Sequence, residues 1–178
     1  DGDDIVSRGA RCAGGEMPAP SKDPGGVRPA AAAGLYYPRD AEGLRCALAT
    51  LLGSGGGTVA GLPKALIVPH AGYAYSGAVA ASAFRTLDNV AAASIRHVVL
   101  LGPSHRVKTH GLALPSCDYF STPFGQVRVH DAGRRRLREL GLAGIADAPH
   151  ALEHSLEVQL PFLQSALKDF DLLPIAVG

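Results

Sequence analysis

The chain has 178 residues, a length typical of a single domain. Its 17 basic residues are nearly balanced by 16 acidic ones, which argues against a nucleic-acid or membrane-surface protein. No apolar run approaches the roughly 20 residues of a membrane helix. The three cysteines have no Cys-x-x-Cys spacing, which disfavours a disulfide framework and a structural zinc site and favours a reducing, cytoplasmic location.

The two ends of the chain differ from its middle. Residues 1–30 are rich in Gly, Pro, Asp and Ala without a hydrophobic period, so we expect a mobile arm or leader. The only methionine, Met17, is a candidate start of the protein. The chain stops in an apolar run at residues 171–178, which is typical of a buried strand. We therefore expect a truncated chain, in which residues 31–178 form the N-terminal part of one domain.

The first half of the chain predicts a strand-helix-strand unit. Leucines and alanines recur at helical spacing over residues 44–52, before a glycine-rich loop at 53–57. Residues 65–68 form an apolar run between two prolines and predict a buried strand. A small-residue helix over about 76–87 and a second buried strand at 97–101 follow. We expect these two strands to be parallel neighbours joined by a right-handed crossover.

The second half adds shorter elements. Extended pieces are predicted near residues 111–114 and 126–130, and a basic helix over about 131–140. A helical stretch over about 152–167 contains Pro161, where it must kink or restart. The predicted class is α/β, with a mixed, largely parallel sheet flanked by helices.

Two histidines follow the two predicted strands. His70 comes directly after the first strand, and His105 follows the second. Ligands bind at the carboxyl ends of strands in such sheets, so the two imidazoles are expected to converge on one metal ion. Tyr73 and Ser104 lie beside them in the sequence and are candidate pocket residues, although Tyr73 can equally well pack in the core.

A third cluster, HALEHSLE, occupies residues 150–157. It contains the H-x-x-E-H pattern of inverted zinc peptidases, with His150 and His154 as ligands and Glu153 as the base. Pro149 and Pro161 disfavour that interpretation, because they leave little helix to carry it. We favour a pocket in which His154 and Glu157, three residues apart on a helix, act as catalytic groups and Glu153 lines the site.

Five segments together resemble the Memo family, called AmmeMemoRadiSam system protein B in prokaryotes. In order, they are AGLYYP (33–38), PHAGYAYSG (69–77), LGPSH (101–105), TPFG (122–125) and EHSLEVQLPF (153–162). The resemblance covers roughly residues 27–178. It implies a fold similar to the class III extradiol ring-cleaving dioxygenases, which are non-haem Fe(II) enzymes.

The resemblance also implies a metal pocket. His70 and His105 correspond to metal ligands for iron or copper, while a family cysteine ligand and a further pocket histidine would lie beyond Gly178. The expected function is redox or dioxygenase-like activity on an unknown substrate. The alternative is a non-catalytic adaptor that holds a peptide or an anionic ligand in the same pocket. Expected partners are a small molecule or peptide and other proteins of the AmmeMemoRadiSam system.

Overall fold

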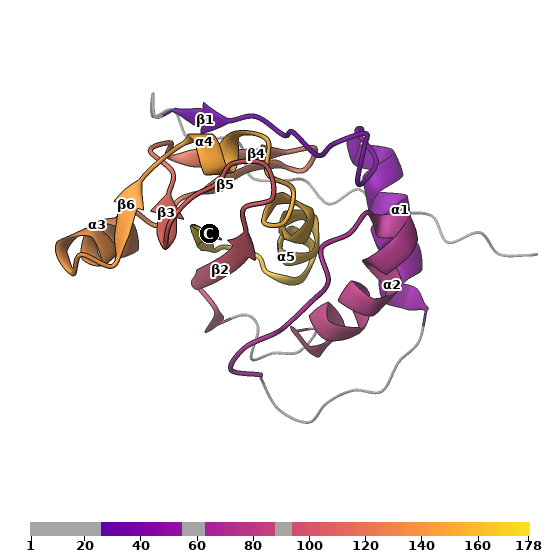
Figure 1. Ribbon diagram of the computed structural model, residues 1–178. Helices are drawn as coiled ribbons and strands as arrows, with labels where there is room; N and C mark the ends of the chain where they lie inside the picture. Colours follow the sequence, from indigo (N-terminus) through magenta and orange to yellow (C-terminus); the bar gives the residue numbers. More distant parts are fainter. Residues whose placement is uncertain (1–25, 55–62, 88–93) are drawn as a thin grey trace, which may run out of the picture.

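A computed structural model describes residues 26–54, 63–87 and 94–178 and confirms the predicted α/β class with mixed sheets (Figure 1). The larger sheet has the order β2-β7-β3-β6. In it, β7 pairs in parallel with β2 and antiparallel with β3, and β3 pairs in parallel with β6. These strands are β2 (His97–Pro103), β3 (Leu112–Leu114), β6 (Ala143–Ile145) and β7 (Asp171–Val177).

A smaller sheet has the order β1-β4-β5. Its strands are β1 (Val27–Arg28), β4 (Tyr119–Thr122) and β5 (Gly125–Arg128). Strand β1 pairs in parallel with β4, so residues 27–28 belong to a sheet although they lie within the arm expected over residues 1–30. Residues 1–25 of that expected arm lie outside the described residues. The sequence did not predict β1, β4 or β6, which are only two to four residues long.

The helices are α1 (Ala41–Gly53), α2 (Tyr73–Phe84), α3 (Asp131–Glu139), α4 (Ala148–Ala151) and α5 (Leu160–Ala166), with short 3-10 turns η1 (Arg85–Leu87) and η3 (Glu157–Gln159). The Asp40 carboxylate caps α1 by accepting a hydrogen bond from Gly43 N–H. Leu44 and Leu48 are buried, as the helical spacing predicted. The predicted second helix is confirmed, although α2 begins three residues earlier, at Tyr73.

The main core lies where α2 and α5 pack together. Phe162 of α5 stacks on Phe84 of α2, with ring centroids 4.9 Å apart, and Tyr73 contacts the same Phe162 ring. Leu172 of β7 is fully buried in this core. Each such side chain contributes about 1.5–3 kcal/mol through removal from water.

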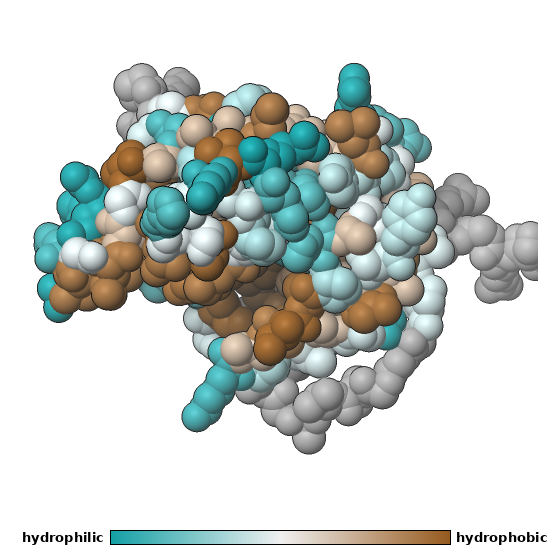
Figure 2. Space-filling model, in the orientation of Figure 1, coloured by the Kyte–Doolittle hydropathy of each residue, from teal (hydrophilic) through white to brown (hydrophobic). Residues whose placement is uncertain are grey.

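The prediction that the strands at 65–68 and 97–101 are parallel neighbours is wrong. Residues 64–70 run without ladder pairing, with Leu66 and Val68 packed on the core and Ile67 fully exposed. The strand predicted at 97–101 forms as β2. Within the described residues β2 pairs only with β7, so it is an edge strand and not the buried strand that the sequence predicts. Val99 and Leu101 are each 58% exposed. Figure 2 shows hydrophobic residues gathered around a hollow on the face that it displays.

The helical stretch predicted over about 152–167, with a kink or restart at Pro161, is interrupted at a different place. Helix α4 ends at Ala151, the chain turns through residues 152–156, and helical structure resumes in η3 and α5. Pro161 lies in the first turn of α5, where a missing N–H costs no helical hydrogen bond. The break therefore lies before Glu157 and not at Pro161, and the helix face expected to carry His154 and Glu157 does not form.

Candidate metal site

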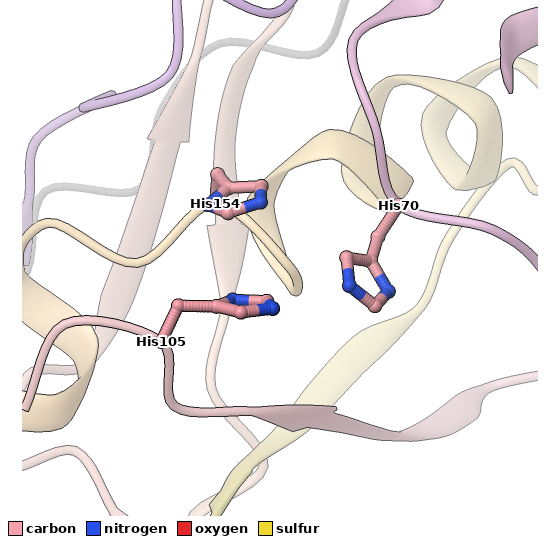
Figure 3. A group of neighbouring side chains, drawn as sticks. All are labelled: His70, His105 and His154. Carbon is pink, nitrogen blue, oxygen red and sulfur yellow. The ribbon is translucent and has the colours of Figure 1, made fainter. Parts of the chain in front are cut away.

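Three histidines from distant parts of the sequence meet beside the end of β2 (Figure 3). His70 precedes α2, His105 follows β2, and His154 lies in the turn between α4 and η3. The ring centroid of His105 lies 5.1 Å from that of His70 and 4.7 Å from that of His154. One nitrogen of each ring lies within 4.8 Å of the others. The predicted approach of His70 and His105 is confirmed, although the strand that was expected to deliver His70 is absent.

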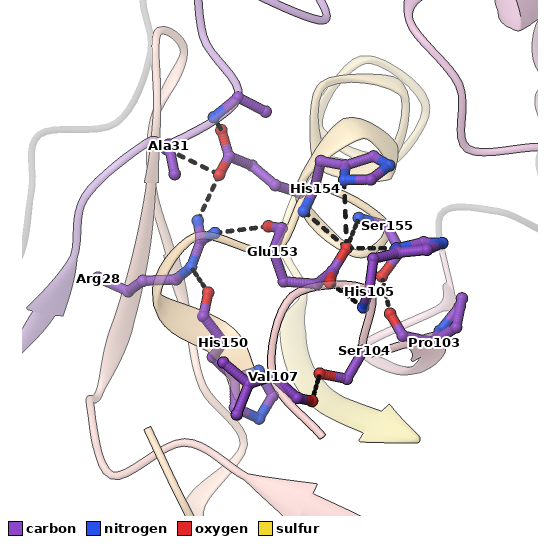
Figure 4. A network of polar contacts seen from close by, with 12 residues as sticks. Arg28, Ala31, Pro103, Ser104, His105, Val107, His150, Glu153, His154 and Ser155 are labelled. Atoms are coloured by element: carbon purple, nitrogen blue, oxygen red, sulfur yellow. Dashed lines mark hydrogen bonds and ion pairs between the residues drawn. The ribbon is translucent and has the colours of Figure 1, made fainter. Parts of the chain in front are cut away.

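Glu153 fixes the positions of two of these histidines (Figure 4). Its carboxylate is buried and accepts backbone hydrogen bonds from His105 (2.6 Å), His154 (2.9 Å) and Ser155 (2.9 Å). The same carboxylate contacts the Nδ1 atom of His105 at 2.9 Å. One side chain therefore ties the loop after β2 to the turn before η3. Glu153 lies beside the cluster, as predicted, and supports it.

The charge of Glu153 determines the proton position on His105. Burial would raise the pKa of the Glu153 carboxyl, but the hydrogen bonds from His105 and Ser155 outweigh burial and lower this pKa to about 2. An ionised carboxylate only accepts hydrogen bonds, so the Nδ1 atom of His105 carries the proton. In the neutral imidazole, the Nε2 atom then keeps its lone pair and is available to a ligand.

The environment favours the neutral forms of His70 and His154. Burial lowers the pKa of His70 and of His154, and the neighbouring imidazoles lower both further. The ring of Tyr36 stacks on His154 with centroids 4.2 Å apart. The buried Nδ1 atom of His154 lies 3.3 Å from a Glu153 oxygen, outside hydrogen-bond geometry, and has no hydrogen-bond partner among the described residues. Neutral imidazoles at His70 and His154, with an unsatisfied nitrogen on His154, are suited to a transition-metal ion.

Glu157 makes a different set of contacts. Its fully buried carboxylate pairs with Arg28 (2.5 Å) and accepts hydrogen bonds from Tyr37 Oη–H (2.6 Å) and from the backbone N–H groups of Ala31 and Ala32. These four contacts use the full accepting capacity of a carboxylate. None of them involves the three histidines. The structure therefore does not bring Glu157 together with His154 as the sequence predicted.

The remaining candidate residues make hydrogen bonds that support the fold. His150 is buried in α4 with its Nε2 atom 3.0 Å from the carbonyl oxygen of Ala113, so the H-x-x-E-H letters form no two-histidine helix face. Tyr73 is buried, and its hydroxyl donates to the carbonyl of Val158 (2.9 Å), which is the packing alternative. The hydroxyl of Ser104 donates to the carbonyl of Val107 within the loop after β2.

Sequence reasoning missed two residues of this region. Tyr36 contacts the cluster through its stacking on His154, and its only sequence signal was its place in the AGLYYP segment. Arg28 lies within the mobile arm expected over residues 1–30, yet it is 6% exposed. Its guanidinium bonds the carbonyls of His150 and Glu153 and the carboxylate of Glu157. A single arginine in a loop-like segment carries no periodicity, so only the three-dimensional structure could reveal it.

Comparison with known proteins gives a consistent set of relatives. The Memo-like protein family matches residues 28–178. A MEMO1 family protein of Aquifex aeolicus is 39% identical over 152 residues, covering 85% of this chain and 55% of the relative. The protein memo-1 homolog of Caenorhabditis elegans is 35% identical over 155 residues, covering 85% of this chain and 43% of the relative. The chain thus spans about half the length of these curated relatives.

Proposed function

The chain belongs to the Memo-like family, and we propose that His70, His105 and His154 bind an iron or copper ion in a protein with redox or dioxygenase-like activity. The observation that carries the proposal is the convergence of three imidazoles from separate segments, with nitrogens within 4.8 Å of one another. Imidazole nitrogen is a good ligand for both metals. His154, expected from sequence as a catalytic residue, is assigned here to metal binding.

The surrounding residues support this use of the cluster. Glu153 holds the Nδ1 atom of His105, the arrangement by which carboxylates orient metal-binding imidazoles and increase their basicity. Lowered pKa values keep His70 and His154 unprotonated at neutral pH, so a metal does not have to displace protons from them. When bound, iron or copper would supply one-electron and O₂ chemistry.

The activity of a whole protein of this family goes beyond these residues. Since this chain spans 55% of the Aquifex relative, we propose for it the part of the site formed by the three histidines. Within the described residues, no helix is long and apolar enough to cross a membrane.

Anaerobic calorimetric titration with Cu(I) and, separately, Fe(II) tests the proposal. We expect at least one of these ions to bind the wild-type chain with defined stoichiometry. His70→Ala, His105→Ala and His154→Ala should each weaken that binding by about 100-fold or more, since even outer-shell changes cost 10–100-fold. Oxygen uptake with added reductant or catechols then tests for redox chemistry.

The matched control is His110→Gln, which changes an exposed histidine outside the cluster. It should bind metal like the wild type. Equal metal affinity in the wild type and in the three alanine variants would overturn the assignment of the cluster. A folded chain that binds neither ion would leave the adaptor alternative as the better explanation of the pocket.

A further inference from the structure

A second group of potential metal ligands lies at the opposite end of the large sheet. His97 is the first residue of β2, Asp171 is the first residue of β7, and His130 directly precedes α3. One ligand atom from each of these residues lies within 4.8 Å of the other two. This second cluster shares no residue with the three-histidine site.

Backbone pairing holds all three residues in place. His97 and Asp171 are direct partners in the parallel register of β2 and β7. Val129 forms a bridge with Leu172, and the backbone N–H of His130 donates to the carbonyl of Leu172 (2.7 Å). Each potential ligand is therefore anchored to the beginning of β7. A site built on strand ends requires little ordering when a ligand binds.

We propose that His97, His130 and Asp171 form a second binding site for a divalent transition-metal ion, with Zn²⁺ as its best-suited occupant. Two imidazoles and a carboxylate match the donor sets of open zinc sites, in which three protein ligands leave a further position for water. The same donors also accept other ions of this class, including Fe²⁺ and Co²⁺.

The distances are compatible with such an ion after small adjustments. Ligand atoms around a tetrahedral zinc ion lie about 3.3–3.6 Å apart, given bonds of about 2.0–2.2 Å. Here the Nδ1 atom of His97 is 2.5 Å from Asp171 Oδ1, and the rings of His97 and His130 stack with centroids 4.4 Å apart. Small rotations of the side chains bring the three donors onto one ion. The side chain of His97 is 60% exposed, which leaves the site open to solvent.

An ion pair between His97 and Asp171 is the competing explanation. Such a pair would join the starts of two adjacent strands, but it gives His130 no role. An exposed pair of this kind contributes only about 0–1 kcal/mol to stability. A metal ion would use all three residues as ligands. The role of His130 therefore distinguishes the two explanations.

The two clusters are independent binding sites. Strand β2 begins at His97 and ends at Pro103, so it spans about 20 Å at roughly 3.3 Å per residue. His105 follows the far end of that strand. A single ion cannot bridge the two clusters, and each should add its own equivalent of bound metal.

The test is a calorimetric titration of the metal-stripped chain with Zn²⁺. In a His70→Ala/His105→Ala background, which lacks the first cluster, we expect one equivalent of zinc to remain. Adding His130→Gln should weaken this binding by about 100-fold or more, while the pair between His97 and Asp171 stays in place. Adding His110→Gln, an exposed histidine outside both clusters, should leave the binding unchanged.

Visible absorption with Co²⁺ gives an independent readout, because the ligand-field bands of a bound ion should disappear in the His130→Gln variant. Should the background variant fail to fold by circular dichroism, the same substitution in the wild-type chain should lower the zinc stoichiometry by one equivalent. Zinc binding that persists unchanged after His130→Gln would overturn the proposal. Absence of stoichiometric zinc binding in the folded background variant would do the same.

Discussion

The buried pair between Arg28 and Glu157 gives the sharpest test of what holds the site region together. The Glu157 side chain is fully buried and that of Arg28 is 5% exposed, so neither charge can be solvated when the other is lost. Arg28 also donates to the backbone carbonyls of His150 (2.8 Å) and Glu153 (2.7 Å). Breaking a buried pair by removing one partner costs about 3–5 kcal/mol. We expect Glu157→Gln, which keeps the side-chain volume, to cost about 3 kcal/mol.

Urea unfolding followed by circular dichroism measures this cost. With a slope of about 1–3 kcal/mol per molar urea, a loss of 3 kcal/mol lowers the unfolding midpoint by about 1–3 M. Glu139→Gln is the matched control, because Glu139 lies 3.7 Å from Arg136 and both side chains are about two-thirds exposed. That control should change stability by less than about 1 kcal/mol. A Glu157→Gln midpoint equal to that of the control would refute the reasoning.

Substitutions at Glu153, Tyr73, Leu172 and Val99 give the remaining expected results. Glu153→Gln should weaken metal binding at the three-histidine cluster by about 10–100-fold in the titration described above. The pKa of the Glu153 carboxyl is about 2 in the folded protein and about 4.3 in the unfolded chain, so its ionised form stabilises the fold at pH values above 4.3. This contribution to the free energy of unfolding is lost as the pH falls from about 4.3 toward 2. In Glu153→Gln, the free energy of unfolding should therefore depend less on pH in that window. Tyr73→Phe should cost about 0.5–1.5 kcal/mol in urea unfolding, through the lost hydrogen bond to Val158, and leave metal affinity unchanged. Leu172→Ala should cost about 2–5 kcal/mol, whereas Val99→Thr on the exposed edge strand should cost less than about 1 kcal/mol by the same measurement.

The site could be predicted from the sequence better than the strand that was expected to build it. His70 and His105 each follow an apolar run and a proline, and this local pattern led to the correct pairing. The run at residues 65–68 looks like a strand because Leu66, Ile67 and Val68 are all apolar. Strand formation also needs a hydrogen-bonded neighbour, however, and the identity of that neighbour is a non-local property.

Helical segments with a regular spacing of apolar or charged residues were predictable because their structure depends on the local sequence. The leucines at 44 and 48 recur on one face of α1, and the charged residues of α3 mark a solvent-facing helix, so local spacing alone decides these elements. The segment 152–156 contains no glycine or proline to announce a break. Its turn is set by Glu153, whose carboxylate accepts the backbone N–H groups of His154 and Ser155 and so replaces helical partners.

The two glutamates of this segment hold it through different partners. Glu153 draws the loop of His105 against the turn that carries His154, which places both rings beside His70. Glu157 pairs with Arg28, whose guanidinium donates to the carbonyl of His150 in α4 and to the carbonyl of Glu153 in the turn. The turn is therefore fixed by a charge network that starts in β1. This network ties the turn that carries His154 to a strand more than 120 residues earlier in the chain, because β1 supplies the arginine that bonds His150 before the turn and Glu157 after it.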